Sequence, residues 1–143
     1  PRLAQRGSSV RRETVDVSVA VVDASAIAAI LFGEPAADEV VERLGASDLA
    51  APSLLPYEIV SVASGKVRRG EASAETAEMA LGALGRVRIV LHEPNSLEVF
   101  RLTGKTRLTA YDAAYLWLAQ SLSADLVTLD EKLARAWSRI AAG

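Results

Sequence analysis

Four carboxylates in this chain stand beside apolar sequence, where an isolated negative charge is unfavourable. The four are Asp23, Glu58, Asp112 and Asp130. A buried carboxylate without a partner carries a large desolvation cost, so each acid needs a cap, a cation or a ligand. Gathered in one pocket without a cation, the four would repel one another and some would take up protons. A hard divalent cation removes that cost, and Mg²⁺ fits because it binds few carboxylates and keeps several waters.

Each acid also has a local explanation that involves no ligand. Asp23 and Asp130 both precede helical sequence, so each could be the N-cap of the helix that follows it. Asp112 could cap its helix or lie in the first turn, where a negative charge is favoured. Glu58 could instead form a surface ion pair with a cation further along its helix, namely Lys66 or Arg68.

Two hydroxyl groups lie close in sequence to these acids. Ser25 comes two residues after Asp23, and Thr128 comes two residues before Asp130. Either hydroxyl could donate a hydrogen bond to a carboxylate and orient it toward a metal ion. Without such a site, Ser25 is an ordinary residue for the start of a helix and Thr128 is a residue with strand propensity.

Basic and aromatic residues around Asp112 are candidates for contact with nucleic acid. Lys105 and Arg107, in GKTRLTAYD, could contact RNA phosphates at the rim of the site, or they could belong to a solvated loop. Tyr111 and Tyr115 could stack on a base, but core packing is favoured on so apolar a helix. The two tryptophans are expected in the core or at an interface; they are Trp117 and Trp137.

The composition limits which kinds of site the chain can build. It has 143 residues, of which 50% are hydrophobic, enough for one domain with a sizeable core. The absence of cysteine excludes disulfides, thiolate nucleophiles and cysteine zinc sites, and a single histidine excludes a multi-histidine metal site. That histidine, His92, is expected in a loop or at the surface, just after a strand. A net charge of -2 argues against binding nucleic acid by bulk positive charge, but an enzyme that meets nucleic acid through metal ions remains possible.

Strand and helix patterns alternate along the chain, and this order predicts how the acids are positioned. Strands are expected over residues 17–22, 48–52, 87–91 and 125–130. Helices are expected over residues 25–33, 36–44, 53–70, 73–85, 95–105, 109–122 and 131–137. Such alternation predicts an α/β fold with a parallel sheet covered by helices on both faces. Functional residues gather at the carboxyl ends of parallel strands, where Asp23 and Asp130 are expected.

The segment before the first strand differs from the rest of the chain. Residues 1–16 are polar and are expected to form an arm or linker, followed by a single domain over residues 17–143. Paired arginines precede the first apolar run, as in some export signals, but Glu13, Asp16 and Asp23 interrupt that pattern. We therefore expect a cytoplasmic protein with no membrane partner.

Four stretches of the chain resemble the PIN-domain ribonucleases, specifically VapC-type toxins of bacterial toxin–antitoxin pairs. The stretches are VVDASAI, PYEIVS, LTAYDAAYLWLA and LVTLDEKLARAW, and the match runs from Val19 to Trp137. The resemblance implies a PIN-like three-layer α/β/α fold with a central parallel sheet. It also implies that the family's four acids correspond to Asp23, Glu58, Asp112 and Asp130.

The same resemblance implies an activity and partners. The expected activity is an endoribonuclease that uses Mg²⁺ or Mn²⁺, in which a metal ion lowers the pKa of a water that attacks the RNA phosphodiester. The expected partners are RNA, a small VapB-type antitoxin and a second copy of the chain. Apolar helix faces, such as those with Leu55, Val62 and Leu81, could form the dimer contact or an antitoxin groove with helix-in-groove binding, and the sequence leaves both open.

Functions of other classes fit the sequence less well. A receiver-like phosphoacceptor also has an acidic Mg²⁺ pocket, but it would pair two acids near the first strand, and Asp23 has no acidic neighbour. A metal-free protein-interaction module would not require four acids beside apolar sequence. A nucleotide-binding Rossmann enzyme would need glycines after the first strand, where this chain has DASA.

Overall fold

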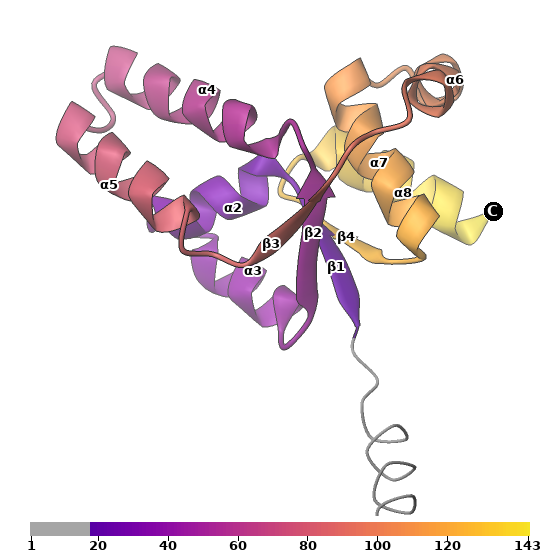
Figure 1. The fold of residues 1–143 in the computed structure, drawn as a ribbon, viewed down its shortest axis with the longest axis horizontal. Coiled ribbons are helices and arrows are strands. Elements are labelled where there is room, and N and C mark those ends of the chain that lie inside the picture. The colour runs from indigo at the N-terminus through magenta and orange to yellow at the C-terminus, as the bar shows by residue number, and fades with distance from the viewer. Residues whose placement is uncertain (1–17) are drawn as a thin grey trace, which may run out of the picture.

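The computed structural model describes residues 18–143, so the expected arm over residues 1–16 lies outside the described residues. Four strands form one sheet: β1 Val19–Val22, β2 Asp48–Pro52, β3 Ile89–His92 and β4 Asp125–Val127. The helices of the described part are α2 Ala24–Leu31, α3 Ala37–Leu44, α4 Leu55–Arg68, α5 Ala74–Leu84, α6 Ser96–Thr106, α7 Ala110–Leu122 and α8 Glu131–Ala142. Strands and helices alternate in the predicted order (Figure 1).

The sheet is parallel throughout, with the strand order β3-β2-β1-β4. Strand β1 lies in the interior of the sheet, and its Val21 is opposite Ala50 of β2 and Leu126 of β4. Val21 and Val22 have no exposed surface, as expected for a parallel strand covered on both faces. The predicted α/β architecture is therefore confirmed.

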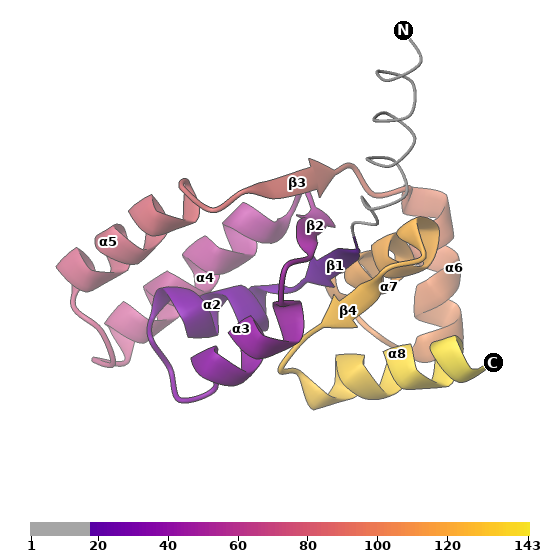
Figure 2. The same ribbon diagram turned by 90° about the horizontal axis from the view of Figure 1, so that it is seen from below.

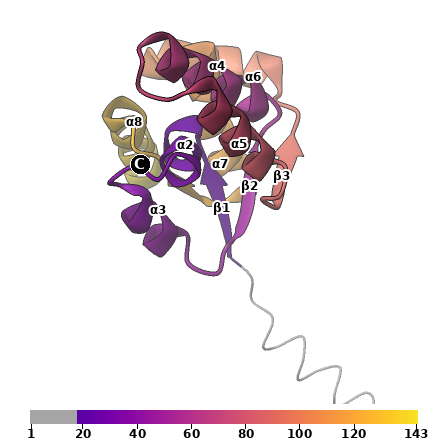
Figure 3. The same cartoon turned by 90° about the vertical axis from the view of Figure 1, so that its left-hand side faces the viewer.

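Helices form a layer on each side of this sheet. Helix α7 packs against β1, β2 and β4, and α6 and α8 pack on α7. On the other side, α2 contacts α3, α4 and α5, and α3 reaches β4. Figures 1 and 2 show the two groups of helices separated by the sheet, and Figure 3 shows α4 and α5 from their own side. The core between the layers includes Ile27, Leu55, Ile59 and Tyr115.

The observed elements differ from the predicted ones mainly at their ends. Strand β4 stops at Val127 because the next three residues turn to begin α8, whereas the prediction continued the strand to Asp130. His92 was predicted just after a strand, but it is the last residue of β3, and its carbonyl accepts a hydrogen bond from the Ser53 amide (2.8 Å). Within residues 18–143, no helix has the length and apolar character needed to cross a membrane.

Candidate active site

Asp23 lies at the junction between β1 and α2 and is held by three hydrogen bonds. Its Oδ1 accepts the Ala26 amide (3.0 Å) and the Ser25 hydroxyl (2.7 Å), while Oδ2 accepts the Thr128 hydroxyl (2.5 Å). The side chain is the N-cap of α2 and is only 5% exposed. Asp23 therefore has the local capping role that the sequence suggested. Its second oxygen also accepts a hydrogen bond from Thr128, which follows β4.

The turn between β4 and α8 fixes the partners of Asp23. The Thr128 hydroxyl accepts a hydrogen bond from the Asp130 amide (3.0 Å), and the Ser25 hydroxyl accepts one from the Leu129 amide (2.9 Å). Asp130 is the N-cap of α8, with Oδ1 accepting the Leu133 amide (3.0 Å). The two hydroxyls thus join the carboxyl ends of β1 and β4, which are distant in sequence.

Glu58 projects from the first turn of α4 and is half-buried. Its Oε1 accepts a hydrogen bond from the Tyr115 hydroxyl of α7 (2.6 Å). The alternative of a surface ion pair is wrong, because within residues 18–143 Glu58 pairs with neither Lys66 nor Arg68, and the Lys66 ammonium pairs with Glu34 (2.6 Å).

Asp112 lies in the first turn of α7, and its backbone amide donates to the Thr109 hydroxyl, which is the N-cap of that helix (3.2 Å). Thr109 therefore occupies the capping position. The Asp112 carboxylate, which is half-buried, is left available for other contacts.

Neighbouring acids change the protonation of Asp23, Glu58 and Asp112. Burial is the largest cause that raises the pKa of Asp23, Glu58 and Asp112 above their ordinary values. Asp130 raises the pKa of Asp23 and Asp112 further, and Asp112 and Asp23 raise that of Glu58. The one cation acting on Asp112 in the described residues is Lys132, which lowers its pKa. The structure therefore brings together four carboxylates with little positive charge to balance them.

The donor chemistry of this pocket fits a hard divalent cation better than any other metal. Carboxylate oxygens are the ligands that Mg²⁺ and Mn²⁺ prefer. In the described residues, however, no three acidic or histidine side chains are already arranged to hold a metal ion. Hydroxyl groups donate to Asp23 and Glu58, and a carboxylate that accepts such a bond keeps further lone pairs for a metal ion.

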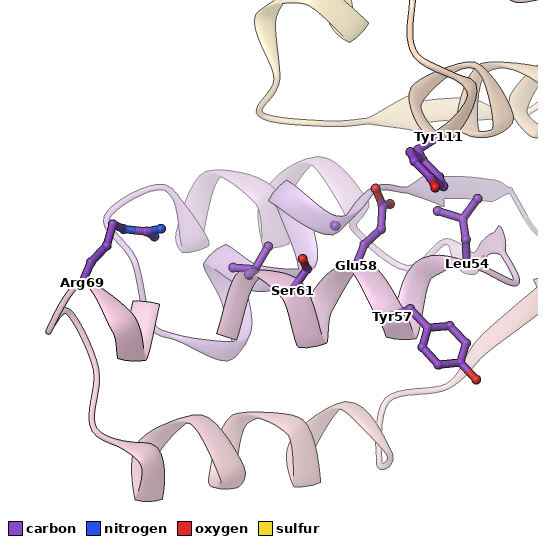
Figure 4. Close-up of a pocket in the computed structure, with 8 residues that line it drawn as sticks. Leu54, Tyr57, Glu58, Ser61, Arg69 and Tyr111 are labelled. Atoms are coloured by element: carbon purple, nitrogen blue, oxygen red, sulfur yellow. The ribbon is translucent and has the colours of Figure 1, made fainter. Parts of the chain in front are cut away.

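A groove of about 630 Å³ runs from Glu58 along α4. It is lined by Ala24, Leu54, Tyr57, Glu58, Ser61, Val62, Arg69 and Tyr111. Figure 4 shows Glu58 and Arg69 on the same side of α4, with Tyr57 turned to the opposite side. Tyr111 was expected in the core, but it is 62% exposed because it begins α7 at the mouth of this groove.

The other residues singled out in the sequence lie away from Glu58. Lys105 lines a separate cleft between α6 and α7, which also includes Trp117. Arg107 follows α6 as its C-cap, with a positive φ of 63°. Neither lines the groove described above. Trp117 and Trp137 are partly buried against the core, as expected for residues of the core or an interface.

Sequence reasoning missed the hydroxyl of Tyr115. The ring was expected in the core and is 1% exposed, but its hydroxyl reaches Glu58. The signal was available, because Tyr115 follows Asp112 by three residues and therefore shares a face of α7 with it.

The comparison with known families assigns this fold. A profile described as PIN domain matches residues 20–137. The chain belongs to the PIN-domain family. Relatives of this PIN domain include "Ribonuclease VapC3" of Mycobacterium tuberculosis, which is 32% identical over 118 residues (82% of this chain and 86% of the relative).

Two further comparisons extend the similarity. "Ribonuclease VapC3" of Pyrobaculum aerophilum is 34% identical over 119 residues (80% of this chain and 91% of the relative). The crystal structure of PAE2754 from Pyrobaculum aerophilum superposes with a TM-score of 0.67 and 27% identity, covering 90% of this chain and 100% of that chain. PIN-domain membership sets aside the receiver-like and Rossmann alternatives.

Proposed function

We propose that this PIN-domain protein is an endoribonuclease of the VapC type that hydrolyses RNA phosphodiester bonds with a divalent metal ion. The proposal includes Asp23, Glu58, Asp112 and Asp130 as the catalytic acids and metal ligands, with Mg²⁺ or Mn²⁺ as the cofactor. The observation that carries it is the raised pKa of Asp23, Glu58 and Asp112, to which neighbouring carboxylates contribute with little cationic compensation. The ribonuclease names of the relatives support the choice of substrate.

In this proposal, hydrogen bonds from neighbouring hydroxyls position the catalytic carboxylates. Asp23 is fixed at the end of β1 by Ser25 and Thr128, so its position is set before any ligand arrives. Glu58 is brought in from α4 and oriented by the Tyr115 hydroxyl. A bound divalent ion would supply charge neutralisation and activation of a water for attack on phosphorus.

The test is a cleavage assay with Asp112→Asn. The change keeps the shape of the side chain and removes one negative charge. If Asp112 binds metal, a hard cation loses a charged oxygen ligand, so cleavage of RNA in Mg²⁺ should be abolished. Removing one of several clustered acids relieves repulsion, so the melting temperature without metal should be equal or higher, with a smaller gain on adding Mg²⁺.

Asp125→Asn is the matched control for this test. Asp125 is exposed at the opposite, amino end of β4, where its Oδ1 accepts a hydrogen bond from the Leu126 amide (2.9 Å). The control should keep wild-type cleavage and the wild-type rise in melting temperature with Mg²⁺. If Asp112→Asn behaves like this control in both measurements, Asp112 is not a metal ligand.

A second candidate function is a metal-free protein-interaction module. The observation in its favour is the exposed apolar surface of β3 and α6, which includes Val90, Leu91 and Phe100. Calorimetric titration with Mg²⁺ and Mn²⁺ separates the two functions. Heat of binding in the wild type that is lost in Asp112→Asn supports the nuclease, and no binding of either ion supports the module.

The proposal extends to partners and to the place of action. It includes a cytoplasmic toxin over residues 17–143, a neutralising VapB-type antitoxin and a homodimer. Exposed apolar side chains on β3 and α6 provide contact surface for such partners: Val90, Leu91, Leu97 and Phe100. Co-expression with the neighbouring open reading frame and pull-down tests the antitoxin, and light scattering of the purified chain tests the dimer.

A further inference from the structure

We infer that Arg69, which lies across Gly65 at the far end of the groove, binds an RNA phosphate distant from the cleaved bond. The inference rests on the proposed function, because it assigns the groove to the RNA strand that enters the acidic pocket. It adds a substrate-positioning residue about three helical turns from Glu58.

The spacing of residues along α4 places the groove and the acidic pocket on one face of the helix. Ser61 and Val62 follow Glu58 by three and four residues, Gly65 follows it by seven and Arg69 by eleven, which are the spacings of one helical face. Arg69 follows Glu58 by eleven residues, which is about 16 Å along a helix axis. Figure 4 shows both side chains on this face. A strand bound at Glu58 and following the groove therefore passes Arg69.

Gly65 explains how the Arg69 guanidinium reaches this face. A Cβ atom on residue 65 would lie 2.8 Å from Arg69 Nη1, which is too close for a real contact. Gly65 is buried in the middle of α4, where glycine is less favourable for the helix than alanine by about 1 kcal/mol. The position of the guanidinium thus depends on a residue that the helix alone would not favour.

Among the described residues, Arg69 is the one cationic side chain that lines the groove. Lys66 is already occupied, because it pairs with Glu34 and lies 5.1 Å from the centre of the Phe32 ring. Arg69 holds Glu71 through Nε (2.5 Å) and Nη2 (3.5 Å), while Nη1 is the atom over Gly65. This ion pair is exposed and therefore weak, so a phosphate can compete for the guanidinium. At the other end of the groove, the exposed ring of Tyr111 offers a surface on which a base can stack.

The first experiment measures cleavage of a single-stranded oligoribonucleotide by the full chain as the RNA is shortened stepwise from each end. For the wild type, KM should rise at the step that removes the phosphate over Arg69. Arg69→Ala should raise KM for the long RNA about fivefold to tenfold with little change in kcat, and should show no such step. Arg68→Ala is the matched control, because it removes the same charge from a neighbouring residue that does not line the groove.

Gly65→Ala is the second variant, because it keeps Arg69 but displaces its guanidinium. It should raise KM by less than Arg69→Ala does, because the flexible guanidinium shifts but keeps its charge, while its stability to urea stays equal to or above that of the wild type. Wild-type KM in Arg69→Ala and Gly65→Ala, with intact cleavage, overturns the inference alone.

A binding measurement makes the inference independent of catalysis. Fluorescence anisotropy of the same RNA in EDTA gives the salt dependence of binding. Loss of one phosphate contact should reduce the slope of log K against log salt by about 0.7 in Arg69→Ala and not in Arg68→Ala. Equal slopes of log K against log salt in the wild type and Arg69→Ala would overturn the phosphate contact. The proposed function fails separately, if the wild type cuts no RNA.

Discussion

Replacing Thr128 with valine tests whether the buried hydroxyl holds Asp23 in its ionised form. Valine matches threonine in shape, so no cavity opens, but the change removes the donor to Asp23 Oδ2 and the acceptor of the Asp130 amide. Both Thr128 and Asp23 are at most 5% exposed, so water cannot easily replace the lost partner of the carboxylate. A buried group left without its partner costs about 1–3 kcal/mol, so we expect a loss of about 3 kcal/mol near neutral pH.

The loss should depend on pH, and its sign follows from the pKa of Asp23. Burial raises this pKa, and the hydrogen bond from Thr128 lowers it. Without the hydroxyl, the pKa of Asp23 rises further, so the variant loses most where the carboxylate is ionised. As the pH falls through the folded-state pKa of Asp23, the protonated carboxyl no longer needs the donor and the difference between variant and wild type shrinks.

The assay is urea unfolding in EDTA at about pH 7.5 and about pH 5. With an m-value of about 2 kcal/mol per molar, the midpoint should fall by about 1.5 M at the higher pH and by clearly less at the lower one. Thr106→Val is the matched control. The Thr106 hydroxyl also donates one hydrogen bond, to Leu102 O (2.7 Å), and accepts one, from Leu108 N (3.2 Å), but neither partner is a carboxylate. An equal loss at both pH values in Thr128→Val, as expected for the control, would refute the reasoning.

Two further predictions concern the protonation of the acidic pocket. Tyr115→Phe removes the hydrogen bond that lowers the pKa of Glu58, so the acidic limb of the pH–rate profile should move to higher pH. An unchanged limb would show that the ionisation of Glu58 does not control the rate of cleavage. In EDTA, wild-type stability should fall as the pH rises from the ordinary carboxyl range through the raised pKa values of Asp23, Glu58 and Asp112, because the folded state binds more protons there. In thermal melts, the melting temperature of Asp112→Asn should depend on pH less than that of the wild type. In saturating Mg²⁺ the wild-type melting temperature should instead rise with pH. The same pH dependence with and without Mg²⁺ would contradict metal binding by ionised acids.

The order of elements could be predicted from the sequence because each element carries its own local signal. The run that forms β1 is short and rich in valine, and the helix of Asp112 is apolar on nearly all sides. The N-caps at Asp23 and Asp130 could likewise be proposed from type and position. These signals depend on residues a few positions apart, so they can be recognised in the sequence without the structure.

The partners of the acids depend on contacts between distant segments, which no local pattern records. Thr128 was expected to orient an acid, but the sequence did not say that its hydroxyl crosses from β4 to Asp23, 105 positions earlier. One local explanation for Glu58 was a cation on its own helix, and the structure gives it a tyrosine from α7 instead. Packing of α7 against the sheet determines this partner, because it brings the Tyr115 hydroxyl to the half-buried carboxylate of Glu58.

The sequence by itself determined which residues could do chemistry and the order of the strands and helices that carry them. The tertiary structure alone decided how those residues meet: that Tyr111 faces solvent while Tyr115 is buried, and that Arg69 reaches the groove of Glu58 across Gly65. The physical reason is that residue type and helical spacing are encoded locally, whereas burial and mutual electrostatic effects arise only when separate elements pack together.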